Sequence, residues 1–334
     1  MEKVTSLQVA ERAGVSQSAV SRVFTPGASA SAKTVEAVKK AAAELGYRPN
    51  RVARAMITGK SRIIGLVVAY LDNQFYPLAL QLLSNALQEQ GYHILVFTAA
   101  NSRGEVDEVM QELLDYQVDG IITASVGMTN DLTRRCADAG IPVVMFNRGQ
   151  AGAEVTSVTS ANVKGGAAVA EFLHSCGHQR FAHISGWVGS STGQDRQAGF
   201  CDTLRAKRID VPVIDGMFDR DTAIAATRTL MESATPPDAI FVGNDHMAFA
   251  VLDTLRSDIG ADVPGDVAVV GYDDVPLAAW PAYELTTMRQ PVNRMVEATV
   301  EALLTRINTP GTAPKRIEID SPLIQRGTTK GPRT

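Results

Sequence analysis

Residues 5–24 read TSLQVAERAGVSQSAVSRVF, and this pattern predicts two short helices joined by a tight turn. Thr5 and Gln8 have the spacing of a helix capping box, and the apolar residues that follow keep a helical period. Because glycine readily adopts a left-handed backbone, the first helix is expected to end at Gly14. Ser16 can then cap a second helix. Two helices around a glycine-containing turn form a helix-turn-helix unit.

The second of these helices, from Gln17 to about Phe24, is expected to present polar side chains outward. Val20 and Val23 point inward, which leaves four polar positions on the outer face: Gln17, Ser18, Ser21 and Arg22. In a helix-turn-helix unit, the second helix enters the major groove of DNA with its N-terminal side chains nearest the bases. Glutamine can bond adenine and arginine can bond guanine, whereas serine is permissive. Taken singly, each position is equally compatible with a solvated surface.

A third helix is predicted from a cap at Ser31 to Leu45, with a stop at Gly46. Residues 47–56 then read YRPNRVARAM, in which the proline interrupts the chain and Asn50 can cap a further short helix. A helix of this length does not persist alone in water. We therefore expect it to order only against DNA or against a second copy of the chain.

Charge is distributed unevenly along the chain. The first 60 residues hold ten Lys and Arg against four Glu, which is a net charge of +6. Because the whole chain carries −4, the remaining residues sum to −10. A basic head on an acidic body indicates that only the head meets a polyanion, although a solvated basic face would carry the same charge.

Length and composition indicate a globular protein of several domains. The 334 residues suit two or three domains, and 45% of them are hydrophobic. No apolar run reaches the roughly 18 residues of a membrane span, and the first residues lack the apolar segment of a secretory signal. The three cysteines form no C-x-x-C pair. We therefore expect a protein of the reducing cytoplasm, with no membrane partner.

From Ile63 onward, short apolar runs alternate with amphipathic stretches, a pattern typical of parallel α/β sheets. Strands are predicted at 63–68, 93–98, 120–123, 142–146, 180–184, 239–242 and 267–271. Helices are predicted at 77–90, 106–116, 132–139, 163–176, 196–206, 222–232 and 247–256. Ligands of such sheets bind beyond the carboxyl ends of the strands, near a point where the strand order reverses.

Two motifs in the body admit an enzymatic or a metal-binding interpretation. Residues 189–193 read GSSTG, the G-x-S-x-G pattern of a hydrolase nucleophile, but the motif does not follow directly on a predicted strand. His174, His178 and His183 could approach a zinc ion, although Gly177 is expected to end the helix between the first two. We favour neither an esterase nor a metal site. The chain has no glycine loop for phosphate or dinucleotide, so no cofactor is expected.

Residues 4–56 resemble the DNA-binding head and hinge of the lactose-repressor/galactose-repressor (LacI/GalR) family, through the motifs AGVS, VSRV, SAKT, ELGYRPN and RVA. The resemblance implies a helix-turn-helix domain over 1–46 and a hinge helix and linker over 47–61. Paired hinge helices would open the minor groove, where an apolar side chain wedges between base pairs. Met56 takes that position in place of the usual leucine. The DNA contacts implied are Thr5, Ser16, Gln17, Ser18, Ser21, Arg22, Asn50, Arg51, Ala53, Arg54 and Met56.

Residues 62–330 resemble the effector-binding domain of the same family, which is similar to periplasmic sugar-binding proteins. The matching segments include VDGII, GIPVV, GND, DVAVVGYDD and LTTMRQP. The implied fold is a three-helix helix-turn-helix head plus a periplasmic-binding-protein-like α/β sensor of two doubly wound lobes. Lobe one would comprise about 62–161 and 291–320, and lobe two about 162–290 and 321–330. A C-terminal strand is expected at about 316–324.

The resemblance carries over a set of effector contacts, most of which follow predicted strands. They are Asp72, Phe75, Asn147, Arg148, Arg196, Asn244, Asp245, Asp273, Trp280 and Gln290. Trp280 would form an apolar wall of the cleft. Some of the others could instead cap helices, as Asn244 could before Met247. The two arginines could hold hydroxyls, a carboxylate or a phosphate, and we favour a sugar or a sugar acid.

The sequence therefore predicts a DNA-binding transcriptional regulator, a repressor rather than an activator, controlled by a small polar effector between two sensor lobes. Because no leucine heptad follows the last strand, we expect a homodimer on a near-palindromic operator of double-stranded DNA. One alternative is a transport-type binding protein, which gives no purpose to a basic head. The other is an enzyme on a doubly wound scaffold. The effector's identity, and whether it releases or strengthens DNA binding, do not follow from the sequence.

Overall fold

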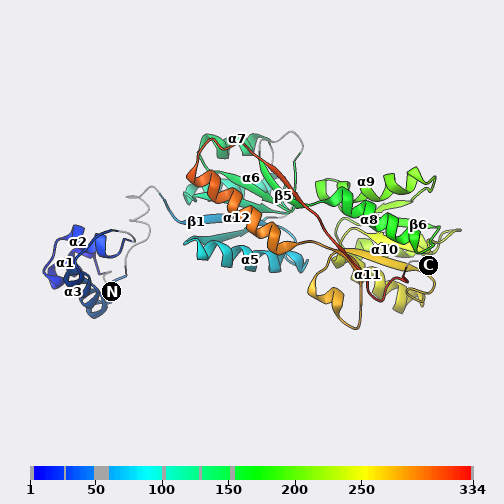
Figure 1. Ribbon diagram of the computed structural model, residues 1–334, viewed down its shortest axis with the longest axis horizontal. Coiled ribbons are helices and arrows are strands. Elements are labelled where there is room, and N and C mark those ends of the chain that lie inside the picture. The colour runs from blue at the N-terminus through cyan, green and yellow to red at the C-terminus, as the bar shows by residue number, and fades with distance from the viewer. Residues whose placement is uncertain are drawn as a thin grey trace. The chain divides into compact units, whose positions relative to one another are not determined.

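The computed structural model describes residues 4–25, 28–48, 60–99, 103–127, 130–150 and 155–331. The chain divides into two compact units, Met1–Ser61 and Arg62–Thr334, which we call the head and the body. Figure 1 labels the helices of the head and many of the elements of the body. No helix in the described ranges combines the length and the apolar character that a membrane span needs.

The described part of the head contains three helices: α1 (Ser6–Ala13), α2 (Gln17–Val23) and α3 (Ala32–Leu45). The predicted capping box is confirmed, since the Thr5 hydroxyl accepts from the backbone of Gln8 and the Gln8 side chain accepts from the Thr5 N–H at 2.8 Å. Ser16 and Ser31 cap α2 and α3 in the same way. The two predicted glycine stops are also confirmed, because Gly14 and Gly46 end α1 and α3 at φ values of +65° and +69°.

A small core holds the three head helices together. Val9 of α1, Val20 of α2 and Val38 of α3 are fully buried and pack with the alanines Ala10, Ala41 and Ala42. This packing fixes α2 with its polar face toward solvent. The predicted hinge helix, with Asn50, Arg51, Ala53, Arg54 and Met56, lies outside the described residues.

The described strands of the body form two six-stranded sheets. The first contains β1 (Ile63–Val68), β2 (His93–Thr98), β3 (Gly120–Ala124), β4 (Val143–Phe146), β5 (Thr156–Ser160) and β11 (Arg316–Ile319), in the order β11-β5-β4-β3-β1-β2. The second contains β6 (Phe181–Ser185), β7 (Val213–Asp215), β8 (Ala239–Val242), β9 (Ala268–Asp273), β10 (Thr286–Arg289) and β12 (Leu323–Ile324), in the order β12-β10-β9-β8-β6-β7. Neighbouring strands are parallel except for the β10–β12 pair, which is antiparallel.

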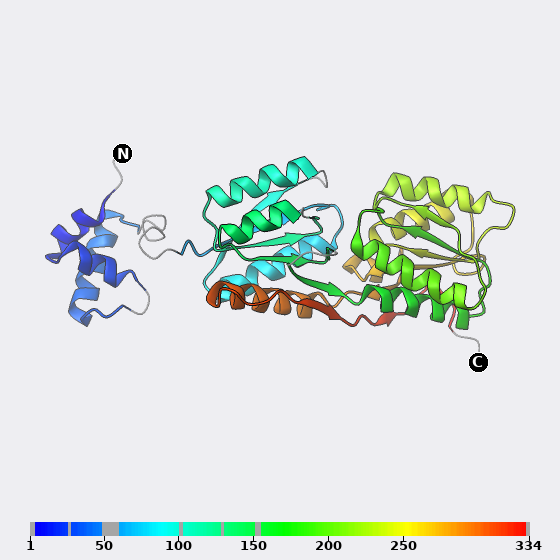
Figure 2. The ribbon, with the colours of Figure 1, turned by 90° about the horizontal axis from the view of Figure 1, so that it is seen from above.

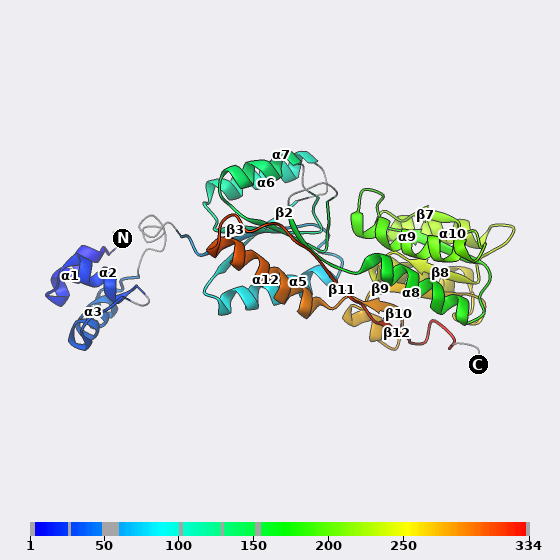
Figure 3. The ribbon, with the colours of Figure 1, turned by 45° about the horizontal axis from the view of Figure 1, so that its top comes forward.

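Helices cover both faces of each sheet, which makes each lobe doubly wound (Figures 2 and 3). Around the first sheet lie α5 (Phe75–Glu89), α6 (Arg103–Asp115), α7 (Asn130–Asp138) and α12 (Val292–Asn308). Around the second lie α8 (Asn162–Ser175), α9 (Ser191–Ala206), α10 (Arg220–Met231) and α11 (Asp245–Asp253). A π-helical turn (Thr254–Ile259) continues α11, and a short 3-10 helix (Pro276–Ala279) follows β9.

Central strands of both sheets are apolar on both sides, as parallel sheets require when helices cover them. In β3, β4 and β8, every residue is buried. The predicted strands at these positions match the observed ones to within a residue or two. By contrast, β5, β7, β10 and α12 were not among the predicted elements. The sequence of β5, TSVTS, offers no apolar run, although all five of its residues are buried.

The chain crosses between the two sheets three times. It leaves the first sheet after β5, returns after β10, and crosses again between β11 and β12. Two crossings are tied together, since the hydroxyl of Ser160 donates to the Gln290 side chain at 3.1 Å. The Tyr272 hydroxyl lies 3.3 Å from the same Ser160 oxygen. The strand ends next to these crossings are therefore held in a fixed arrangement.

Candidate functional site

A pocket between the two lobes gathers the ends of strands from both sheets, and we call it the interlobe pocket. Lobe one contributes Tyr70, Asn73, Tyr76, Ser125, Asn147 and Arg148, and lobe two contributes Thr192, Arg196, Phe218, Asn244 and Asp273. Most of these residues lie at or just after the carboxyl ends of parallel strands, which is where such sheets bind ligands.

Arg196 of α9 is buried and held on several sides. Its Nε donates to the side chain of Asn162 at 2.9 Å, and its Nη1 donates to the carbonyl of Gly243 at 2.7 Å. The guanidinium also lies 3.7 Å above the centre of the Tyr272 ring, a favourable cation–π contact. Nη1 is 3.8 Å from the carboxylate of Asp273. The charge of Arg196 is thus paired within the protein, and its position is fixed before any ligand arrives.

Asp273, the last residue of β9, is the acidic group of the pocket. Its Oδ1 accepts from the Gln290 amide at 2.7 Å, and its Oδ2 accepts from the Asn73 amide at 3.3 Å. Burial raises the pKa of Asp273, and the neighbouring Arg196 together with these two hydrogen bonds opposes the rise. Because Asn73 belongs to lobe one, Asp273 also joins the lobes.

Arg148 follows β4 and is 2% exposed. Its Nη2 donates to the carbonyl of Ser125 at 2.7 Å and lies 3.2 Å from the Ser125 hydroxyl. Its Nε and Nη1 are buried and have no hydrogen-bond partner among the described residues. Desolvation lowers the pKa of Arg148. The pocket therefore contains a buried cation with unused N–H groups.

Asn147 places a second unused polar atom in the pocket. Its amide nitrogen donates to the Tyr76 hydroxyl at 3.1 Å, while its carbonyl oxygen is buried without a partner in the described part of the chain. Its backbone is left-handed, with φ of 54°, which asparagine tolerates better than most residues. Burial raises the pKa of Tyr76, so this phenol stays neutral and can bond the amide.

Three of the polar contacts that join the lobes involve residues at or next to the pocket. One is the Asn73–Asp273 hydrogen bond, and another runs from the Gly149 N–H to the Ser191 hydroxyl at 2.9 Å. The third pairs the Asp72 carboxylate with His246 Nε2 at 3.4 Å. Ser191 is the serine of the hydrolase-like motif, and here its oxygen accepts a hydrogen bond across the lobes. The pocket is therefore sensitive to how closely the lobes approach each other.

Several residues expected in the cleft support its walls without lining it. Phe75 is buried and stacks on Phe146, with ring centroids 6.1 Å apart. Asp245 accepts from the Thr287 hydroxyl at 2.6 Å and from the Val275 N–H at 3.0 Å. Burial, reinforced by the charge of Asp273, raises the pKa of Asp245 to about 8. These side chains support the strand ends without lining the pocket.

Asn244 both caps a helix and lines the pocket, and these were the two alternatives that the sequence left open. Its side chain accepts from the Met247 N–H at 2.9 Å and so caps α11. It also lines the interlobe pocket.

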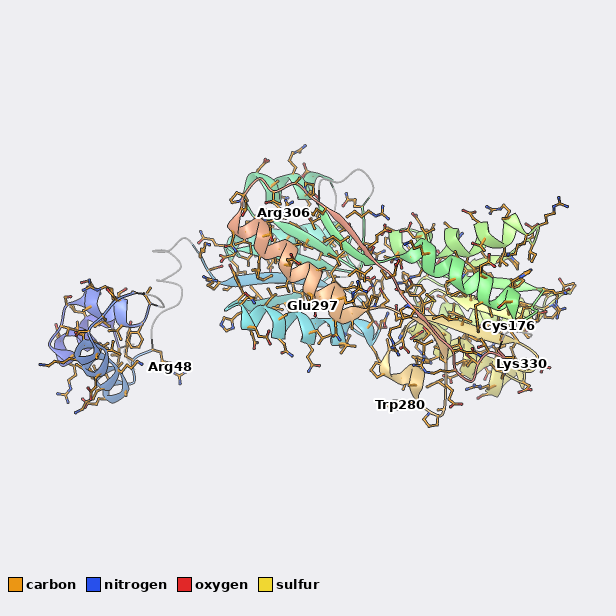
Figure 4. All side chains as sticks on the ribbon, viewed as in Figure 1. Arg48, Cys176, Trp280, Glu297, Arg306 and Lys330 are labelled. Atoms are coloured by element: carbon orange, nitrogen blue, oxygen red, sulfur yellow. The ribbon has the colours of Figure 1, made fainter. Side chains whose placement is uncertain are left out.

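Trp280 does not reach the interlobe pocket. It follows the 3-10 helix, is 58% exposed, and lies at the outer edge of lobe two in Figure 4. The apolar wall expected from Trp280 is supplied instead by Tyr70 and Phe218, whose rings meet edge to face at 6.3 Å across the lobes.

The remaining lining residues were missed at the sequence level. Asn73 and Ser125 follow β1 and β3, so the rule that ligands bind at strand ends could have found them. Tyr70 and Phe218 have left-handed backbones, with φ of 58° each, which no sequence pattern around them signals. Tyr76 and Thr192 lie inside helices, where a polar residue is ordinary.

The head presents the polar face that was predicted for α2. Gln17, Ser18, Ser21 and Arg22 are all exposed. The amide of Gln17 donates to the Ser6 hydroxyl at 2.9 Å, which orients it from α1. The hydroxyls of Thr5 and Ser16 cap helices, as described above. This face has the chemistry of a base-reading helix.

The histidines of the body take part in structural contacts. His183 lies in β6 with Nδ1 2.9 Å from the Phe241 carbonyl, and its ring stacks on the Phe241 ring. Burial lowers the pKa of His183 to about 4, so it is neutral at ordinary pH. Among the described residues, no group of three His, Cys, Asp or Glu could hold a metal ion.

Comparison with known proteins identifies the family. Residues 7–50 match the bacterial regulatory proteins of the lacI family, and residues 170–329 match a periplasmic binding protein-like domain. The HTH-type transcriptional regulator CelR of Thermobifida fusca is 34% identical over 328 residues, which cover 95% of this chain and 96% of CelR. The chain belongs to the LacI family. The predictions of a helix-turn-helix head, a binding-protein-like sensor and a transcription regulator are thereby confirmed.

Solved structures of LacI-family regulators have the same fold over the whole chain. The CelR–cellobiose complex is 32% identical, with a TM-score of 0.73, and the match covers 98% of this chain and 100% of that one. The lac repressor dimer bound to operator and the anti-inducer ONPF is 26% identical, with a TM-score of 0.87 and coverage of 98% and 99%. These relatives are DNA-binding regulators rather than enzymes.

Proposed function

We propose that this protein represses transcription by binding a near-palindromic operator as a homodimer, and that a small polar ligand in the interlobe pocket controls this binding. The observation that carries the proposal is the pocket itself. It is lined by both lobes and holds a preorganised pair, Arg196 and Asp273, at its centre. A ligand that touches both lobes favours one arrangement of them over another.

On the DNA side, the proposal rests on α2 and on the hinge. The four exposed polar residues of α2 would read base edges in each half-site, while Thr5 and Ser16 would contact the backbone from the helix starts. For the hinge we keep the assignment made from sequence: Asn50, Arg51, Ala53 and Arg54 would bind the minor groove, and Met56 would wedge between base pairs. Such a regulator acts on DNA in the cytoplasm.

On the ligand side, the pocket favours a sugar or a sugar acid. Arg196 and Asp273 offer a donor and an acceptor side by side, and the unpaired carbonyl of Asn147 can accept from a hydroxyl. Tyr70 and Phe218 supply the apolar faces on which a sugar ring packs. Cellobiose in the complex of CelR supports the sugar class.

We further propose that the ligand is bound and released without chemical change. The serine of the hydrolase-like motif accepts a hydrogen bond from Gly149, and no histidine is among the residues that line the pocket. A generic ester assay on the wild type and on Ser191→Ala tests this point. Hydrolysis that disappears in Ser191→Ala would contradict it.

Selection from a library of random DNA duplexes tests the DNA-binding part of the proposal. Full-length protein should enrich a near-palindrome with two half-sites. Gln17→Ala and Arg22→Ala should each weaken binding to the enriched site by about 1–3 kcal/mol and leave binding to unrelated DNA nearly unchanged. A mobility-shift titration at several salt concentrations measures both.

Equal affinity for every duplex at all salt concentrations would contradict a sequence-specific regulator. A matched control is Arg205→Ala in α9, an exposed arginine of the body whose loss should not affect DNA binding.

A further inference from the structure

The charge of Arg148 is unusual for a side chain so deep in the protein. Its only hydrogen-bond partners in the described residues are two oxygens of Ser125, both of them neutral. No described carboxylate forms an ion pair with it, whereas Arg196 in the same pocket lies 3.8 Å from Asp273. A buried charge without a counter-ion is strongly unfavourable, so a partner from outside the chain would stabilise it.

Among the described residues around Arg148, no group compensates its positive charge. Desolvation lowers its pKa, and the nearby groups that act on it are the phenols Tyr76 and Tyr70 and the like-charged Arg196. Burial raises the pKa of Tyr76, so this phenol is neutral. Counting the lining residues, the pocket holds two arginines and one carboxylate. It therefore carries one net positive charge in the absence of a ligand.

We propose that the effector is a sugar acid whose carboxylate accepts hydrogen bonds from Arg148. This inference rests on the proposed function and specifies its ligand. Nη2 is already held by Ser125, which orients the guanidinium, and the unpaired N–H groups of Nη1 are left for a carboxylate oxygen. Charge-assisted hydrogen bonds of this kind are about twice as strong as neutral ones.

The other polar groups then hold the hydroxyl end of the ligand. The Asn147 carbonyl oxygen, which is buried and has no partner among the described residues, accepts from a hydroxyl. Across the pocket, Asp273 accepts from hydroxyls and Arg196 donates to them. An uncharged sugar would leave the Arg148 charge buried and unpaired. A phosphate monoester carries about two negative charges at neutral pH, one more than the pocket can neutralise.

The test compares acids with their uncharged amides on the full-length protein. The probes are D-glucuronate, D-galacturonate and D-gluconate, each with the corresponding amide, which keeps the shape and removes the charge. Binding is measured by calorimetry, and the midpoint of thermal unfolding is recorded with and without each probe. At least one acid should bind, and its amide should bind at least tenfold more weakly.

Two arginine variants test whether Arg148 causes the preference for the acid over its amide. Arg148→Met should remove the preference for the acid, because it removes the cation and keeps the bulk of the side chain. Arg205→Met removes an exposed arginine of α9 and should bind like wild type. An amide that binds as tightly as its acid, or an acid that binds Arg148→Met as tightly as wild type, would overturn the inference. If such a ligand still altered DNA affinity, the proposed function would stand without it.

If none of the six probes binds, the thermal stability of the ligand-free variants still tests the inference. Arg148→Met removes an uncompensated buried charge, so its unfolding midpoint should be higher than that of Arg205→Met. A midpoint that is unchanged or lower would mean that the guanidinium is already stabilised within the protein, and the inference would fail.

Discussion

At the scale of single residues, the side chains that line the interlobe pocket are held in place by other residues of the protein. Arg196 is fixed by Asn162, by the Gly243 carbonyl and by the Tyr272 ring, so little conformational entropy remains to be lost when a ligand binds. Asp273 is held by Gln290 and Asn73. A preorganised donor and acceptor of this kind give orientation and specificity.

Arg196 lines the pocket and Trp280 does not, so replacing each residue should affect ligand binding differently. Arg196→Met should abolish ligand binding, since it removes a buried donor and leaves Asp273 without its counter-ion. Trp280→Ala should bind the ligand with unchanged affinity, because the side chain is exposed at the edge of lobe two. Calorimetric titration measures both. A tenfold loss in Trp280→Ala would show that the ligand reaches this edge after all.

Asp245 predicts a dependence of stability on pH. Its pKa is raised from 3.8 to about 8, so between these values the native chain keeps a proton that the unfolded chain has released. Its contribution to the unfolding free energy therefore falls as pH rises toward 8. Asp245→Asn is neutral throughout and should gain stability relative to wild type from pH 5 to pH 8, by at most about 1.4 kcal/mol per pH unit.

Urea unfolding of both proteins across this range measures the difference. A difference that does not change with pH would mean that Asp245 is ionised in the native state. Because Asp245 does not line the pocket, ligand affinity of the variant should be close to that of wild type.

At the residue scale, the sequence predicted the features that depend on only a few neighbouring positions, such as helix caps and helix stops. The capping box at Thr5 and the stop at Gly14 are local signals, and the structure has both. Asn147, Arg148 and Arg196 were carried over from the family resemblance; the first two follow the recognised strand β4, and Arg196 lies inside α9. Tyr70 and Phe218 could not be predicted, since their positions depend on left-handed turns and on how the two lobes meet.

Among the elements, the α8–α9 pair decides where Arg196 lies. The two helices approach closely through glycines on each. A Cβ on Gly166 of α8 would lie 2.1 Å from the Arg196 carbonyl, and one on Gly199 of α9 would lie 2.0 Å from the Val163 carbonyl. Because these contacts are to backbone, no side-chain rotation relieves them. The glycines therefore set the distance between α8 and α9, and with it the position of Arg196 at the pocket.

Gly199→Ala should force α9 away from α8. We expect a loss of at least about 1–3 kcal/mol in unfolding free energy, which is the usual cost of overpacking, together with weaker ligand binding because Arg196 moves with the helix. Asp202→Ala, at an exposed site three residues further along α9, is the matched control and should change neither quantity by much. Thermal unfolding and calorimetry of the two variants provide the comparison. Full ligand affinity in a folded Gly199→Ala would contradict the positioning role.

The strand β5 was not predicted because polar residues form most of it. In β5, Thr and Ser occupy four of five positions, yet the strand is buried and pairs with β4 and β11. The Thr156 hydroxyl accepts from the Lys315 backbone at 3.2 Å, and Ser160 bonds Gln290. These side chains find partners in distant segments, so hydrophobic period could not reveal them. The start of α9 was placed at Arg196 rather than Ser191 because the serine cap at Ser190 was read as part of a loop.

For the body as a whole, three crossings and several polar contacts set how the lobes meet. The crossings lie beside the pocket, so a ligand held by both lobes acts directly on the segments about which they can move. Coupling between a ligand site and DNA binding is a free energy, typically about 1–3 kcal/mol, or about 5- to 150-fold in affinity. It is also reciprocal, so operator DNA must change ligand affinity by the same factor.

The most direct test of the account measures operator affinity with and without ligand, in wild type and in Arg196→Met. The operator is the palindrome recovered by selection, and the ligand is a probe that raises the unfolding midpoint of the wild-type protein. The account predicts that saturating ligand changes the operator affinity of wild type at least fivefold and leaves that of Arg196→Met unchanged. An equal change in both proteins, or no change in a wild type that binds the ligand, would contradict control of DNA binding through the interlobe pocket.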